Sequence, residues 1–167
     1  MGNVVKTESY LEMMKDSLDK KIELLKQIQE KNKEQYNILS VQLKDNEVDQ
    51  EAFDKIVEEK SEIADELYVL NDGFTSLFDN LKNEINDNKE RYKDQIIHMQ
   101  GQIRDIMDLT NTIELQEHAN KELADTFFSN ERKKLKGVRN SSRASMNYYQ
   151  NMNRSKVEES MFMDEKQ

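Results

Sequence analysis

Two histidines and many carboxylates are the side chains that could perform chemistry in this chain of 167 residues. His98 and His118 lie twenty positions apart, about 30 Å along a straight helix, so they cannot share a metal ion within one chain. Neither follows a glutamate at the third position before it, as the Glu-x-x-His pattern of di-iron helical bundles requires. The four-residue spacing of Glu114 and His118 allows a surface pair. Without any cysteine, thiolate metal sites and disulfide bonds are excluded.

The carboxylates give no better indication of an active site. A catalytic carboxylate needs burial or crowding to shift its pKa, and nearly all acidic residues here fall on the polar faces of expected helices. Glu117 is the exception, because it occupies an apolar seam at a point where that seam turns polar. The chain has no nucleophile paired with a base and no glycine-rich phosphate loop. We therefore predict that it is not an enzyme and uses no metal or other cofactor.

Long helices must position these residues, because the chain has no proline and only 4 glycines and so has few turn formers. Apolar residues recur at helical spacing in three segments, about 7–43, 49–86 and 89–136. Polar breaks at 45–49 and 86–88 separate the segments, with Asp49 as an N-cap, whereas the apolar pattern continues in phase through Gly73. The predicted fold is all-α: three long antiparallel helices in an elongated, coiled-coil-like bundle. We expect a body over residues 1–137 that ends near Gly137 and a C-terminal tail over 138–167.

Charge is distributed unevenly and argues against several kinds of partner. Residues 40–90 hold 15 acidic and 5 basic side chains, whereas residues 131–143 hold 6 basic and 1 acidic. The strongly acidic middle segment would repel a polyanion, so we expect no nucleic-acid binding. The sequence contains no run of 18 apolar residues, so we expect no membrane-spanning helix. The N-terminal sequence also lacks the apolar segment of a signal peptide. A cytoplasmic location is expected.

The tail differs from the body in composition and is the main clue to function. It contains four of the nine methionines, and Ala144, Tyr148 and Met152 are spaced four apart, with Met146 and Tyr149 beside them. This spacing predicts a short amphipathic helix, which alone is marginal in water. Methionine-rich and aromatic surfaces suit adaptable binding of a partner. We expect that the body does not cover this segment and that it folds on a partner helix.

Several stretches resemble FlgN-type flagellar export chaperones of Gram-positive bacteria. They are residues 66–81 (ELYVLNDGFTSLFDNL), 92–103 (YKDQIIHMQGQI), 119–123 (ANKEL) and the tail 143–152 (RASMNYYQNM). Their order and spacing carry the resemblance over residues 10–153. Relatives often carry a proline near residues 86–89, and this chain has none.

The resemblance implies a cytoplasmic chaperone in flagellum biogenesis. Such chaperones hold the terminal helices of hook-associated (junction) subunits, prevent their premature assembly and deliver them to the flagellar type III secretion apparatus. It also implies that the client contacts Asn120 in the last long helix and the tail residues, which are Ala144, Met146, Tyr148, Tyr149 and Met152. On this hypothesis, deletion of residues 138–167 abolishes client binding and leaves melting of the body nearly unchanged.

Two other functions fit the same pattern. The second helical segment has an apolar face long enough for self-association, so the chain could be a homo-oligomeric coiled-coil scaffold, and a homodimer is compatible with either function. A FliT-type chaperone for the filament cap protein is the other alternative. Light scattering tests for the homo-oligomeric scaffold, and co-purification from cells distinguishes the two kinds of chaperone by their clients.

Overall fold

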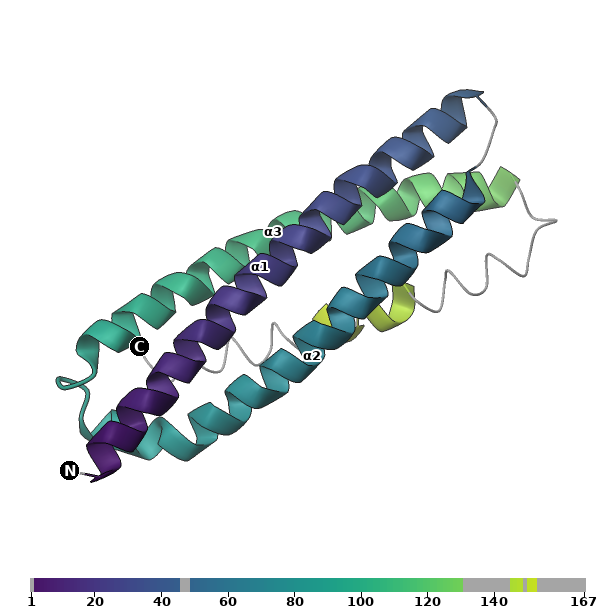
Figure 1. Ribbon diagram of the computed structural model, residues 1–167. Helices are drawn as coiled ribbons and strands as arrows, with labels where there is room; N and C mark the ends of the chain where they lie inside the picture. Colours follow the sequence, from purple (N-terminus) through teal and green to yellow (C-terminus); the bar gives the residue numbers. More distant parts are fainter. Residues whose placement is uncertain (1, 46–48, 131–144, 149, 153–167) are drawn as a thin grey trace.

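Three long helices form the bundle of the computed structural model, which describes residues 2–45, 49–130, 145–148 and 150–152. They are α1 (Gly2–Asp45), α2 (Gln50–Asp87) and α3 (Lys93–Asn130). The helices lie alongside one another and alternate in direction, so the N-terminus lies at the same end as the α2–α3 turn (Figure 1). The all-α, three-helix fold predicted from the sequence is confirmed, and the described residues contain no strand.

Polar residues end the helices where the sequence breaks its apolar pattern. The Asp49 side chain accepts a hydrogen bond from the Ala52 backbone N–H at 3.0 Å, so Asp49 caps α2 as predicted. At the other end of α2, the Asn88 side chain donates to the Glu84 carbonyl at 2.9 Å. The chain then turns through residues 88–92, and buried Tyr92 packs into the core just before α3 begins.

The observed helix limits differ from the predicted ones at several ends. Helix α1 begins at Gly2 rather than near residue 7, and α3 begins at Lys93 rather than near residue 89. Helix α2 passes through Gly73 without interruption, as expected from the continuous apolar pattern. The predicted end of the body at Gly137 and the whole basic stretch 131–143 fall outside the described residues.

Helix α1 is the central element of the bundle. It packs against both α2 and α3, whereas no Cα atom of α2 lies within 8 Å of a Cα atom of α3. Helices α2 and α3 therefore meet only through long side chains or through segments placed between them. This open side of the bundle is where the candidate site lies.

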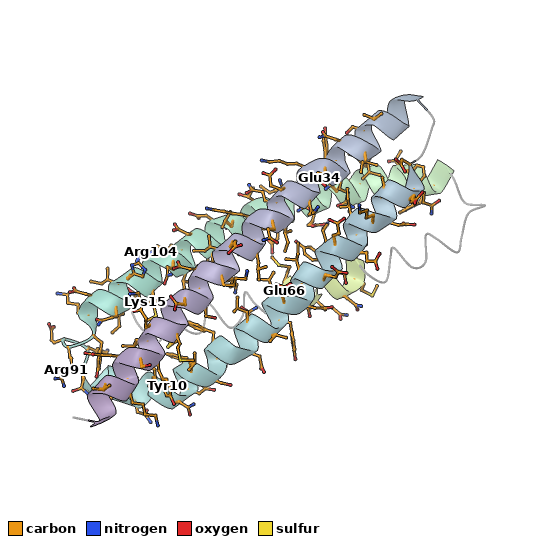
Figure 2. The ribbon with its side chains drawn as sticks, viewed as in Figure 1. Tyr10, Lys15, Glu34, Glu66, Arg91 and Arg104 are labelled. Carbon is orange, nitrogen blue, oxygen red and sulfur yellow. The ribbon has the colours of Figure 1, made fainter. Side chains whose placement is uncertain are left out.

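Apolar side chains form two buried clusters. The smaller cluster joins the end of α1, the start of α2 and the end of α3, where the Phe53 and Phe128 rings meet edge to face with centroids 5.7 Å apart. The larger cluster runs along the rest of the bundle and includes Leu25, Leu67 and Ile106. Charged side chains such as Glu34, Glu66 and Arg104 cover the outer faces (Figure 2), which gives the expected amphipathic arrangement.

Candidate helix-binding site

A lysine and a glutamate meet inside the bundle, where charged side chains are rare. Lys60 of α2 and Glu117 of α3 form an ion pair with 2.6 Å between Nζ and Oε1, and each side chain is 6% exposed. The Lys60 ammonium also donates to Gln35 Oε1 of α1 at 3.0 Å. One buried cation thus links all three helices at a single level of the bundle.

Amide side chains complete this polar layer. Asn120 of α3, only 2% exposed, donates to the Asn32 backbone carbonyl of α1 at 3.0 Å. The Asn32 side chain donates in turn to Gln116 Oε1 at 3.2 Å. These bonds form in one alignment of α1 and α3, so the layer favours that register over slipped alternatives.

Burial and the neighbouring carboxylate act in opposite directions on the pKa of Lys60. Loss of solvent lowers the pKa of Lys60, and the adjacent Glu117 carboxylate opposes this by stabilising the ammonium form. A buried charge left without its partner is strongly destabilising. The ammonium is therefore tolerated in this buried position because the Glu117 carboxylate lies beside it.

The C-terminal segment covers this polar layer. Residues 145–148 and 150–152 are helical and lie alongside α2 (Figure 1). Tyr148 and Met152 belong to the larger buried cluster and are 2% and 5% exposed. The Lys60 ammonium lies 4.9 Å from the Tyr148 ring centroid, a cation–π contact. We call Lys60, Glu117 and the surface under Tyr148 and Met152 the tail-binding surface.

The predicted client-binding residues are thus placed in different surroundings. Asn120, Tyr148 and Met152 are buried, Asn120 in the polar layer and the other two over it, whereas Met146 is 63% exposed. Ala144 and Tyr149 lie outside the described residues. The expectation that the body leaves the tail uncovered is wrong for Tyr148 and Met152, because the separation of α2 and α3 leaves room for their side chains. The client-binding role of these residues stays a prediction.

Lys60 was not predicted as a site residue, although the sequence carries a signal for it. It is the one charged residue in a row of apolar residues seven apart in α2, and Glu117 interrupts the apolar seam of α3. A cation and an anion at core positions of different helices suggest a pair. Helical periodicity alone does not show which helices face each other, so the pairing required the structure.

The histidines do not form a site in the described part of the chain. His98 is exposed, and His118 lies 3.3 Å from the Glu122 carboxylate on the surface of α3. No cluster of three or more metal-ligating His, Cys, Asp or Glu side chains occurs among the described residues.

A second apolar surface lies between α1 and α2. It is lined by Met13 and Leu24 of α1 and by Val69, Leu70 and Leu77 of α2. Met13 and Val69 are exposed at 51% and 70%. No segment of the described chain covers this groove, in contrast to the tail-binding surface.

Comparison of the chain with known protein families, with curated proteins and with solved structures gives no match. Nor does any helix in the described ranges combine the length and apolar character needed to cross a membrane.

Proposed function

We propose that this chain is a cytoplasmic export chaperone that holds the terminal helices of flagellar junction subunits. In this role it keeps those helices from assembling early and delivers them to the type III export apparatus. The mechanism is physical and involves no covalent chemistry. The resemblance of stretches such as 66–81 and 143–152 to FlgN-type chaperones supports junction subunits as the class of client.

The observation that carries this proposal is the amphipathic C-terminal segment packed on an open side of the bundle. Helices α2 and α3 stay apart, and a short helix presenting Tyr148 and Met152 covers the surface beside them. A bundle that binds one amphipathic helix in this way has the geometry needed to bind another.

The position of the segment changes one expectation about the tail. Deletion of residues 138–167 was expected to leave melting of the body nearly unchanged. Because Tyr148 and Met152 are buried, the deletion removes core side chains and uncovers the Lys60–Glu117 pair. A truncated chain is therefore a poor test of client binding, and point variants of the full chain are preferable.

The test is binding of the full chain to a C-terminal helical fragment of a junction subunit, measured by calorimetry and by co-purification from flagellated cells. The proposal predicts a one-to-one complex with the fragment and recovery of junction subunits from cells. Recovery of the filament cap protein alone would assign a FliT-type role. A tight homodimer that binds no flagellar subunit would refute the proposal and favour a scaffold.

A further inference from the structure

A short segment of the chain covers the tail-binding surface. Since no Cα atoms of α2 and α3 approach within 8 Å, solvent would reach the Lys60–Glu117 pair if nothing lay over it. The cover consists of two described turns that contribute Tyr148 and Met152 from one face, while Met146 on another face is 63% exposed. A helix this short has little stability of its own.

The chemistry of the contact specifies what else could bind there. Lys60 already has a carboxylate partner in Glu117, so an aromatic ring satisfies its remaining face better than a second acid does. Tyr148 and Met152 are four residues apart and therefore lie on the same face of a helix. A replacement helix must present an aromatic residue and, four positions later, methionine or an aliphatic residue.

Charge further narrows the choice of partner. Helix α2 carries 11 acidic and 3 basic residues over Gln50–Asp87. The segment that binds beside it is flanked in sequence by the basic residues Arg143, Arg154 and Lys156. A partner helix with basic flanks is favoured on this acidic face, and one with acidic flanks is repelled.

We propose that the tail-binding surface is a docking site for a partner protein's amphipathic helix with this pattern, and that residues 145–148 and 150–152 occupy it in the free chain. The partner helix takes the place of Tyr148 over Lys60 and of Met152 over the adjacent apolar surface. In naming a client helix as the partner, the inference rests on the proposed function. The surface and its pattern do not depend on which protein supplies the helix.

In the first experiment, substitutions remove the tail side chains that cover the surface in the full chain, and a separate peptide that carries these side chains is added. A labelled peptide with the sequence of residues 141–156 is titrated into wild type, a Tyr148→Ala/Met152→Ala variant and a Met146→Ala control, and anisotropy is followed. The occupied surface weakens apparent affinity in proportion to its occupancy, so the double variant should bind at least about tenfold more tightly than wild type and control. Equal affinities for all three chains would overturn the proposal.

Two altered peptides test the pattern itself. Alanine at the positions of Tyr148 and Met152 should abolish binding to the double variant. Glutamate at the positions of Arg143, Arg154 and Lys156 should weaken binding, most strongly at low salt. Unchanged affinity of the alanine peptide would show that binding does not use the tail-binding surface and would overturn the proposal.

A second measurement decides the matter if the double variant does not fold. The chain has no tryptophan, so Tyr148→Trp places a single indole at the tail-binding surface. Excess unlabelled peptide should shift its emission to longer wavelength as water reaches the indole. Emission that does not move at saturating peptide would overturn the proposal. If the peptide shifts the emission and junction-subunit fragments do not bind, the docking site stands and the flagellar assignment fails.

Discussion

Replacing Lys60 by methionine tests whether the Lys60–Glu117 pair is shielded from solvent, as its burial indicates. The substitution keeps an unbranched side chain of similar length and removes the ammonium with its hydrogen bond to Gln35, which leaves Glu117 buried without its cation. Breaking one side of a buried pair costs about 3–5 kcal/mol. For a chain of this size, we expect the melting temperature to fall by roughly 6–20 °C.

The double variant Lys60→Met/Glu117→Leu separates loss of the pair from loss of packing. Replacing both charges by apolar groups of similar volume is often neutral or stabilising. We expect the double variant to recover most of the stability lost in Lys60→Met. The two substitutions should therefore be strongly non-additive, as side chains in direct contact are.

Urea unfolding followed by circular dichroism is the assay. The matched control is Lys55→Met, which removes an exposed lysine of the same helix. A loss in Lys60→Met no larger than in this control would refute a desolvated pair.

Three further predictions concern other contacts. Tyr148→Ala should destabilise the chain by about 3–5 kcal/mol through lost packing, whereas Met146→Ala should stay within about 0.5 kcal/mol, both measured by urea unfolding. The hydrogen bond to Lys31 lowers the pKa of Glu59, so the contribution of about 0.5 kcal/mol from this surface pair should persist at neutral pH. It should fade as the pH drops below the ordinary Glu59 value of 4.5, and a Glu59→Gln comparison across pH that shows no such change would contradict it. Asp49→Ala should cost about 1 kcal/mol by removing the N-cap of α2, with Asp49→Asn as the control that retains a capping oxygen.

The fold could be predicted because its local signals agree with one another. Apolar residues seven apart, such as Leu11, Leu18 and Leu25, predicted a buried face, and all three are buried. Asp49 marked the start of a helix by its capping chemistry. Gly73 did not break α2, because the apolar pattern stayed in phase on both sides of it.

The site was harder to predict because it depends on contacts between distant segments. Helical periodicity placed Lys60 and Glu117 at core positions of separate helices, but the distance between helices follows from how α1 packs against both. The tail pattern correctly placed Tyr148 and Met152 on one face. It could not show that the chain's own bundle leaves a space of the right size for them.

The central position of α1 has a consequence for the order in which the chain folds. Contacts between α1 and α3 join residues more than 80 positions apart, such as Asn32 and Gln116, whereas α1 and α2 form a local hairpin. Local contacts close with less loss of chain entropy, and the N-terminal part of a chain leaves the ribosome first. We therefore expect the α1–α2 hairpin to form before α3 packs against it. During that interval the face of α1 that α3 later covers is open to water.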